Sequence, residues 1–227
     1  CSSLESLSIP FVGGSRNTSV KTFHPLGYIF GTSYYTGSVS TFQPAHGYTN
    51  TASGTPYTRY YIPESLKHVT VTGTDILSAS FYECTNLTSI TFTGSITAIG
   101  WGSFNNCIRL TKVNISDLAS WCAINLSDWA SNPLEYADNL YINGELATDL
   151  IIPDSVTSIG KYTFRSCTSL TSVTIPDSVT SIGEGAFYYC TSLTSVTIPD
   201  SVTSIGAYTF YNCTSLTSVT LGDSVTS

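Results

Sequence analysis

The 227-residue chain contains seven cysteines, and these are its most evident candidates for a chemical role. Thiols form disulfides, bind zinc and act as nucleophiles. Five of them fall into two runs with 23-residue steps: Cys84, Cys107, Cys167, Cys190 and Cys213. Stacked repeats would bring equivalent side chains to within about 5 Å of each other, but the side chains would run parallel. The count is odd, and no C-x-x-C pair favours zinc. We therefore expect a buried ladder of reduced thiols that pack as small hydrophobic side chains.

Four aspartates also recur in 23-residue steps, and a column of carboxylates could attract a cation: Asp154, Asp177, Asp200 and Asp223. Three of them follow a proline and Asp223 follows a glycine, and turn chemistry explains an aspartate there without a metal. The three histidines have no acidic or cysteine partner at ligand spacing: His24, His46 and His68. We expect no metal and no cofactor.

No motif of nucleophilic, phosphate-binding or metal-dependent catalysis occurs: G-x-S-x-G, the P-loop and H-E-x-x-H are all missing. A retaining glycan hydrolase would need two carboxylates about 5 Å apart in a cleft. The carboxylates nearest to the aromatic segment described below are Glu64, Asp75 and Glu83, and nothing else singles them out. We expect a non-catalytic protein, with a glycan-active enzyme as the least favoured alternative.

The composition of the chain limits the classes of partner that the protein can bind. Only 10% of residues are charged, against about a quarter in soluble domains, and the net charge is −7. Scattered Lys and Arg and an acidic pI near 4.7 argue against nucleic acid. No apolar run approaches the ~18 residues of a membrane span, and no signal peptide is present. Both ends fall within a repeat, so we expect a fragment of a longer array.

The elements that must position these residues are repeats of 23 residues. In each unit, L-T-S-V-T-I alternates as a half-buried strand, P-D-S makes a turn, and V-T-S-I is a second short extended piece. A final segment directs a Phe and a Cys inward, so that Phe164, Phe187 and Phe210 continue the ladder. No unit can bury its own apolar edge, so the units must stack into a solenoid with a parallel sheet along one face and little helix.

The pattern I-P-x-x-V-x-x-I-G-x-x-x-F-x-x-C resembles the leucine-rich repeats of the BspA-like, or Treponema-type, family. The match extends over residues 146–227 and 62–115. The resemblance implies a curved repeat solenoid, with its parallel β-sheet on the concave face of a right-handed coil. It also implies a secreted or cell-surface bacterial protein with a role in adhesion or host contact.

Two gaps interrupt the repeat. Residues 116–145 separate two strands by 37 residues instead of 23, and we expect a short helix capped by Ser116 and a hairpin turning at Asn143-Gly144. One interpretation is that Trp121 and Trp129 pack this segment onto the solenoid. The alternative is that they build a ligand site.

Residues 11–61 form the larger gap, after a partial leading repeat at 1–10. They are rich in Gly, Ser, Thr and aromatic residues, a composition typical of binding loops, and YIFGTSYY suggests a strand and turn. The segment is either a packed cap, a recognition surface or disordered. Its candidate contact residues are Tyr28, Phe30, Tyr34, Tyr35, Phe42, Tyr48, Tyr57, Tyr60 and Tyr61.

The sequence thus predicts five parts: 1–10, 11–61, the repeats 62–115, the second insertion 116–145 and the repeats 146–227. Our first hypothesis for function is a binding module for an extracellular protein or glycoprotein. The second is a spacer that presents another domain, which the near-identity of the last three units favours. The ligand and the oligomeric state are not determined by the sequence.

Overall fold

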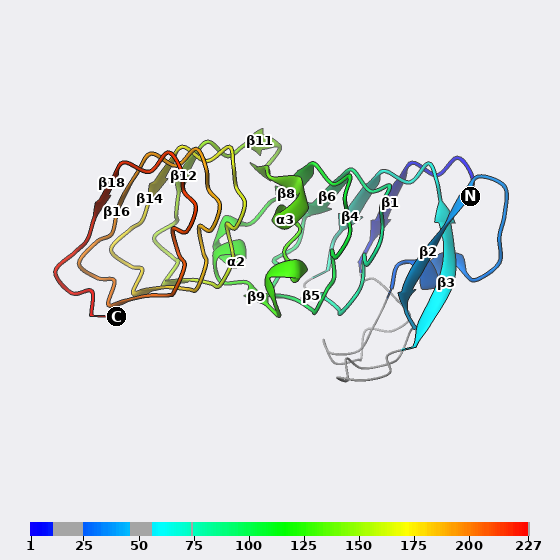
Figure 1. The fold of residues 1–227 in the computed structure, drawn as a ribbon, viewed down its shortest axis with the longest axis horizontal. Helices are drawn as coiled ribbons and strands as arrows, with labels where there is room; N and C mark the ends of the chain where they lie inside the picture. The colour runs from blue at the N-terminus through cyan, green and yellow to red at the C-terminus, as the bar shows by residue number, and fades with distance from the viewer. Residues whose placement is uncertain (11–24, 46–55, 74, 227) are drawn as a thin grey trace.

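The computed structural model describes residues 1–10, 25–45, 56–73 and 75–226, and all statements below concern these residues. The chain coils into an elongated solenoid, with the N- and C-terminal residues at opposite ends (Figure 1). Parallel strands stack along its length, and helix is confined to a few short turns. The predicted fold class is confirmed.

One face of the solenoid carries two sheets in succession. The first has the order β1-β4-β6-β8-β10-β11, and all its pairs are parallel except β10-β11. Its strands are β1 Ser6–Ile9, β4 His68–Val71, β6 Ser89–Phe92, β8 Lys112–Ile115, β10 Leu140–Ile142 and β11 Glu145–Leu146. The second sheet is parallel throughout and consists of β12 Asp149–Ile151, β14 Ser172–Thr174, β16 Ser195–Thr197 and β18 Ser218–Thr220.

The V-T-S-I pieces form shorter parallel ladders elsewhere on the coil. Their strands are β5 Asp75–Ile76, β7 Ala98–Ile99 and β9 Asn125–Leu126, and then β13 Ser158–Ile159, β15 Ser181–Ile182 and β17 Ser204–Ile205. Register is kept because each Ile faces the core and pairs with the Ile of the next unit. A slip of one residue would turn every Ile to solvent.

Columns of Phe and Cys fill the core, as the repeat predicts. Phe164 stacks on Phe187 with ring centroids 5.4 Å apart, and Phe187 stacks on Phe210 at 5.7 Å. The Cys190 thiol is free and donates to the Phe164 carbonyl oxygen at 3.2 Å, and the Cys213 thiol does the same to Phe187 at 3.1 Å. Burial raises the pKa of the Cys190 thiol well above its ordinary value. The described thiols inside the array therefore act as packing groups.

Threonine hydroxyls join successive units. The Thr194 Oγ1 donates to the Thr171 carbonyl oxygen at 3.2 Å, and the Thr217 Oγ1 donates to Thr194 at 3.1 Å. The equivalent bond from Thr180 to Thr157 measures 3.1 Å at another corner of the coil. Each such bond satisfies a backbone oxygen one unit away, which explains why these threonines recur unchanged.

Residues 116–145 are part of the coil as well as an elaboration of it. β9 and β10 extend the two ladders, so the segment supplies another turn of the solenoid. Between them lie α2 Leu118–Cys122, the 3₁₀ turn η1 Trp129–Ser131 and α3 Leu134–Ala137. The hairpin is confirmed, because β10 pairs with β11 and both Asn143 and Gly144 have positive φ.

The predicted cap of the helix is wrong by one residue. Asp117, rather than Ser116, is the N-cap of α2, and its carboxylate accepts from the Ser120 backbone N–H at 3.1 Å. A carboxylate at this position also interacts favourably with the helix dipole. The Ser120 hydroxyl, then the Ser120 backbone N–H and the Ser95 hydroxyl, donate to this carboxylate and hold the pKa of Asp117 below its ordinary value.

The described part of residues 11–61 packs on the solenoid as a helical turn and a hairpin. The turn is α1 Gly27–Phe30, so the strand expected at YIFG is wrong. The hairpin pairs β2 Ser38–Pro44 with β3 Tyr57–Pro63 and lies at the N-terminal end of the coil (Figure 1). The Gln43 amide donates to the Tyr82 carbonyl oxygen at 2.5 Å and accepts from the Gly27 N–H at 2.9 Å, which ties both elements to the array.

None of the helices in the described ranges is long and apolar enough to span a membrane.

Candidate binding site

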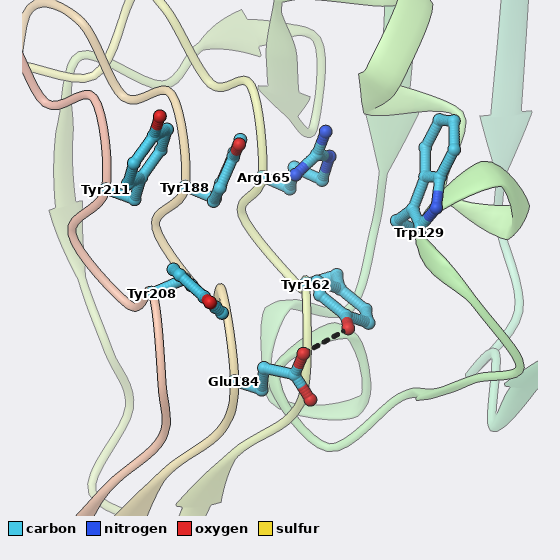
Figure 2. Close-up of a pocket in the computed structure, with 7 residues that line it drawn as sticks. All are labelled: Trp129, Tyr162, Arg165, Glu184, Tyr188, Tyr208 and Tyr211. Carbon is cyan, nitrogen blue, oxygen red and sulfur yellow. Dashed lines mark hydrogen bonds between the residues drawn. The ribbon is translucent and has the colours of Figure 1, made fainter.

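A hollow of about 380 Å³ opens on the side of the C-terminal repeats (Figure 2). We call it the aromatic hollow, and its lining residues are Trp129, Tyr162, Arg165, Glu184, Tyr188, Tyr208 and Tyr211. Trp129 comes from η1, and the others come from the residues before and within the F-x-x-C segments of three successive repeats. The volume is at the small end of the range for ligand pockets, about 300–1,000 Å³.

Four of these side chains form a continuous row across the hollow (Figure 2). The Arg165 guanidinium lies 4.1 Å from the centroid of the Tyr188 ring and 5.4 Å from that of Trp129. Tyr188 in turn stacks on Tyr211, with centroids 4.9 Å apart and an interplanar angle of 18°. Cation–π attraction and ring stacking therefore fix the row, and its members need little further ordering when a ligand binds.

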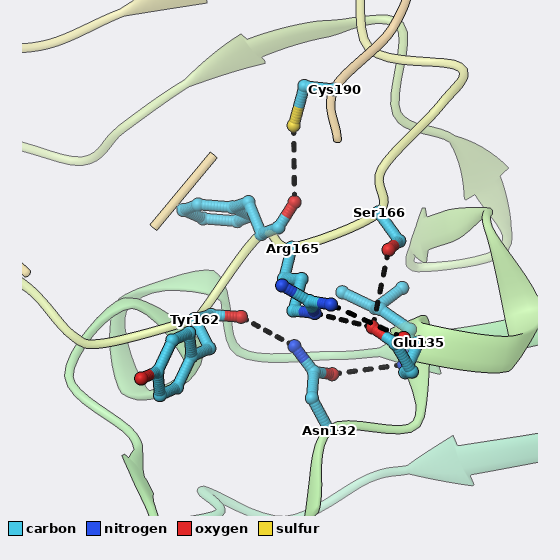
Figure 3. A network of polar contacts seen from close by, with 8 residues as sticks. Asn132, Glu135, Tyr162, Arg165, Ser166 and Cys190 are labelled. Carbon is cyan, nitrogen blue, oxygen red and sulfur yellow. Dashed lines mark hydrogen bonds and ion pairs between the residues drawn. The ribbon is translucent and has the colours of Figure 1, made fainter. Parts of the chain in front are cut away.

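The charge of Arg165 is neutralised from behind by Glu135 of α3 (Figure 3). Its Nε donates to Glu135 Oε2 at 2.5 Å and its Nη2 donates to Oε1 at 3.4 Å. The neighbouring Asn132 amide donates to the Tyr162 carbonyl oxygen at 2.6 Å. The 116–145 segment thereby clamps the first of the regular repeats and holds Trp129 at the edge of the hollow.

A second, lower row consists of Tyr162, Glu184 and Tyr208 (Figure 2). The Tyr162 hydroxyl donates to Glu184 Oε1 at 2.7 Å, and Lys161 lies 3.4 Å from Oε2. Burial, followed by the bond to the carboxylate, raises the pKa of Tyr162 to about 12. The same bond is the main reason why the pKa of Glu184 is lowered. Glu184 therefore faces the hollow as a carboxylate at neutral pH.

The backbone beneath the lower row is left-handed. Tyr162, Gly185 and Tyr208 occupy equivalent places in three repeats, with φ of 59°, 57° and 58°. Glycine suits this conformation, whereas a tyrosine there costs about 1–2 kcal/mol. Two of the three repeats nevertheless have a tyrosine there, Tyr162 and Tyr208, and both line the hollow. The third repeat has Gly185, which leaves the centre of the hollow open.

A comparison of the three repeats within the chain singles out the same residues. The segments 153–175, 176–198 and 199–221 are identical at all but six positions, and five of the six fall in the stretches 161–166, 184–189 and 207–212. Every residue of the aromatic hollow except Trp129 lies in these stretches. A comparison of the positions that differ between the copies would have identified these residues from the sequence. A search for the positions that the copies share does not identify them.

A larger hollow of about 600 Å³ lies over β13, β15 and β17. Its lining repeats Ser-Ile-Gly from each unit, as in Ser181-Ile182-Gly183, and offers few distinguishing side chains. We therefore regard the aromatic hollow as the candidate site.

The predicted aromatic residues of the N-terminal segment have different surroundings. Tyr28, Tyr34, Phe42 and Tyr57 are exposed, Phe30, Tyr35 and Tyr61 are half-buried, and Tyr60 is buried. Tyr34 meets Tyr61 edge to face at 5.9 Å, and Arg59 lies over Phe42 at 4.6 Å. Tyr48 lies outside the described residues. Tyr28 is in α1, whereas Phe42 and Tyr57 lie on the hairpin and Tyr34 packs against its strand β3; we call these last three side chains the aromatic surface of the hairpin.

The two tryptophans of the second insertion separate in role. Trp121 is 1% exposed and its indole N–H donates to the Thr163 carbonyl oxygen at 3.1 Å, which favours the packing interpretation for this residue. Trp129 is 49% exposed and lines the aromatic hollow.

Two of the three carboxylates considered for catalysis, Glu83 and Asp75, accept structural hydrogen bonds. Glu83 accepts from the Phe42 N–H at 3.2 Å, and Asp75 accepts from the Thr97 hydroxyl. Across the described residues, no three His, Cys, Asp or Glu side chains are grouped so that they could hold a metal ion. The arrangement in the aromatic hollow suits non-covalent recognition, with ring surface, one carboxylate acceptor and a paired guanidinium.

Comparison with known proteins identifies the repeat. A family model described as the BspA type leucine rich repeat region matches in six copies, at residues 57–125 and 136–227. A search of curated proteins found no match.

Three solved structures of bacterial proteins resemble the chain. A leucine rich cell surface protein from Faecalibacterium prausnitzii is 32% identical over 69% of this chain and 39% of its own, with a TM-score of 0.45. Leucine-rich repeat proteins from Bacteroides ovatus and Eubacterium ventriosum are each 21% identical, over 74% and 70% of this chain and 43% and 60% of theirs, with TM-scores of 0.45 and 0.41. The chain thus spans less than two-thirds of the length of each.

The family model covers well over half of the chain, and the matched residues include the columns of Phe, Cys and Ile that build the core. The protein belongs to the BspA-type leucine-rich repeat family.

Proposed function

We propose that this chain is a non-catalytic binding module of a secreted or cell-surface bacterial protein, and that it recognises an extracellular protein or glycoprotein. The observation that carries the proposal is the placement of the differences between the three C-terminal repeats. They gather around the aromatic hollow, while the surfaces of the strands stay the same. Variable side chains on a rigid repeat scaffold are the usual way in which solenoids bind partners.

The residue types at the hollow fit recognition. Tyrosine and tryptophan supply large, rigid contact surfaces at low cost in conformational entropy, and they are enriched where proteins bind partners. Tyr208 and Tyr211 are 65% and 52% exposed, and Tyr208 occupies a left-handed position of the repeat at which a glycine would be less costly. Exposed aromatic side chains held at a cost in backbone energy support a role in binding.

The exposed aromatic surface of the hairpin supports a second contact area at the other end of the described coil. Tyr34, Phe42 and Tyr57 are 68%, 46% and 47% exposed. The two areas could engage one extended partner together, and the gain from such bivalent contact depends on the spacing of the partner's sites.

The alternative function is a spacer that presents another domain. The unchanged face of β14, β16 and β18 favours it, because hydroxyls repeated without variation carry little information for a partner. Surface plasmon resonance distinguishes the two functions. The chain is passed over immobilised extracellular-matrix proteins and mucins, beside a hollow variant (Trp129→Ala with Tyr208→Ala) and a hairpin variant (Phe42→Ala with Tyr57→Ala).

A binding module should bind at least one of these surfaces and lose at least tenfold in affinity in one of the two variants. Binding that neither variant changes would exclude both candidate surfaces. Failure of the unaltered chain to bind any of the immobilised proteins would favour the spacer.

A further inference from the structure

We propose that the aromatic hollow is a subsite for one neutral sugar unit of a glycan. This inference rests on the proposed function and specifies the chemistry of its ligand. A sugar ring has a face of C–H groups bounded by hydroxyls, and it needs an exposed aromatic ring beside hydrogen-bonding groups that are fixed in place. The hollow provides both.

The aromatic surface is available at the two ends of the hollow. Trp129 is 49% exposed, and Tyr208 and Tyr211 are 65% and 52% exposed, whereas Tyr188 lies between Arg165 and the Tyr211 ring. Figure 2 shows Trp129 and Tyr208 on opposite sides, with Tyr162 and Glu184 between them along the lower row. A sugar ring lying against either aromatic ring would have its hydroxyls near the polar groups of both rows.

The hydrogen-bonding groups suit neighbouring hydroxyls. The Glu184 carboxylate accepts one bond from Tyr162 and retains further lone pairs. The Arg165 guanidinium has five N–H donors, and the two bonds to Glu135 leave others for a ligand. An acceptor and a donor fixed in this way can bind two hydroxyls of one ring.

The charges favour a neutral sugar over an acidic one. Glu135 already neutralises Arg165, and Glu184 places a negative charge in the hollow. The chain as a whole carries a net charge of −7. A sialic acid or uronate would therefore meet repulsion and find no unpaired cation among the residues that line the hollow.

The stacking of the row argues against a proline-rich peptide. Such peptides insert prolines between parallel aromatic rings that line a groove. Here the ring centroids of Tyr188 and Tyr211 are 4.9 Å apart, so the two rings are in contact and leave no space for a proline between them. The Arg165 guanidinium covers the other face of the Tyr188 ring.

Gly185 keeps the hollow open. A Cβ atom at this position would lie 2.8 Å from Cδ1 of the Tyr162 ring. A tyrosine is compatible with the backbone, because Tyr162 and Tyr208 adopt the same left-handed conformation in the flanking repeats. Gly185→Tyr should therefore fold with some loss of stability, because the Tyr162 ring must move aside, and it should fill the hollow.

The test is isothermal titration calorimetry and NMR line broadening with neutral hexasaccharides of glucose, mannose, xylose and N-acetylglucosamine, together with N-acetyllactosamine. Sialyllactose and decaproline are the comparison probes. The proteins are the unaltered chain, Trp129→Ala, Tyr208→Ala and Gly185→Tyr, with Ile108→Ala as the control of an exposed apolar side chain outside both candidate surfaces. Thermal unfolding verifies that each variant is folded.

We expect at least one neutral oligosaccharide to bind, each of the three hollow variants to weaken its binding about tenfold or more, and Ile108→Ala to leave its binding unchanged. Preference for sialyllactose or decaproline, equal binding by all variants, or no binding of any neutral sugar would overturn the proposal. If the chain binds a glycoprotein equally well after its glycans are removed, the sugar subsite is wrong and the binding function stands. If it binds no protein before or after that treatment, the binding function itself fails.

Discussion

The strand face and the aromatic hollow of the C-terminal repeats are built from the same three units, yet they differ in character. On the strand face, Ser172, Ser195 and Ser218 pair in register and the units are identical. At the hollow, the equivalent positions hold Arg165, Tyr188 and Tyr211. The comparison teaches that the residues are the same in every unit where their side chains bond one unit to the next. They vary where the side chains do not have to make such bonds.

The physical reason lies in the hydrogen bonds. Threonine hydroxyls beside the strands donate to carbonyl oxygens of the preceding unit, so a change there removes a bond between units. At the hollow, side chains meet each other through rings and a guanidinium, and different residues can occupy the same place. The following predictions test this contrast.

The core column that both surfaces share should give the largest effect. Phe187 is 1% exposed and stacks on Phe164 and Phe210, so Phe187→Ala leaves a cavity and should lower the free energy of unfolding by about 3–5 kcal/mol. Urea unfolding followed by circular dichroism measures it, with the exposed Phe42→Ala as the control, expected within about 1 kcal/mol. A loss of less than about 1.5 kcal/mol in the free energy of unfolding would show that the column of Phe rings does not support both surfaces.

Removal of Arg165 should come next. Arg165→Ala leaves Glu135 without its ion pair and deprives Tyr188 of its stacking partner, so we expect a loss of about 1–3 kcal/mol in the free energy of unfolding. Lys161→Ala is the matched control, because the Lys161–Glu184 pair is exposed and should change stability little. Equal effects of the two changes in urea unfolding would show that the row is not a structural unit.

Replacement of Tyr208 separates stability from binding. Because its backbone is left-handed, Tyr208→Gly should be more stable than Tyr208→Ala by about 1 kcal/mol, while both variants lose any ligand of the hollow. Thermal unfolding gives the order of stability and the plasmon resonance experiment gives the binding. If glycine were no better than alanine here, tyrosine would carry no cost at this position, and one argument for a role in binding would fall.

The strand side should respond more modestly. Thr194→Val keeps a β-branched side chain and removes the bond to the Thr171 carbonyl oxygen, and we expect a loss of about 0.5–1 kcal/mol. Binding at the hollow should stay unchanged. Urea unfolding measures the first quantity and plasmon resonance the second, and a loss of binding would mean that the two surfaces are coupled.

The smallest effect is a pH dependence from Glu184. Its pKa is lowered in the folded state, so its contribution is present above the pKa of the unfolded chain, about 4.3, and is lost as the pH falls through the folded value. The free energy of unfolding of Glu184→Gln should therefore be lower than that of the unaltered chain near pH 7, and the two values should approach each other near pH 3. Urea unfolding at the two pH values measures this, and a difference that grows on acidification would have the wrong sign.

Much of the solenoid follows from the sequence. The strand ends inferred from the repeat, such as Ile175 and Ile198, lie within one residue of β14 and β16. The inward Phe and Cys columns and the Asn143-Gly144 turn are also confirmed. These features depend on alternation, turn residues and a fixed period, which are local properties of the chain.

Errors arose where local preferences compete. Ser116 and Asp117 are both good N-caps, and the choice of Asp117 depends on where the preceding strand β8 ends. The segment Gly27–Phe30 has aromatic residues typical of strands, but its first N–H bonds the Gln43 side chain, which belongs to a hairpin far along the chain. Tertiary contacts overrule β-propensity in such places.

The sequence by itself determined the period, the solenoid and the inward-facing columns, because stacking is the one way for each unit to bury its apolar edge. Only the tertiary structure decided the aromatic hollow. It brings Trp129 of the 116–145 segment to residues of three repeats, and it pairs Arg165 with Glu135, 30 residues away along the chain. Side chains from separate turns become neighbours through the coiling of the backbone, and no spacing within one unit contains that information.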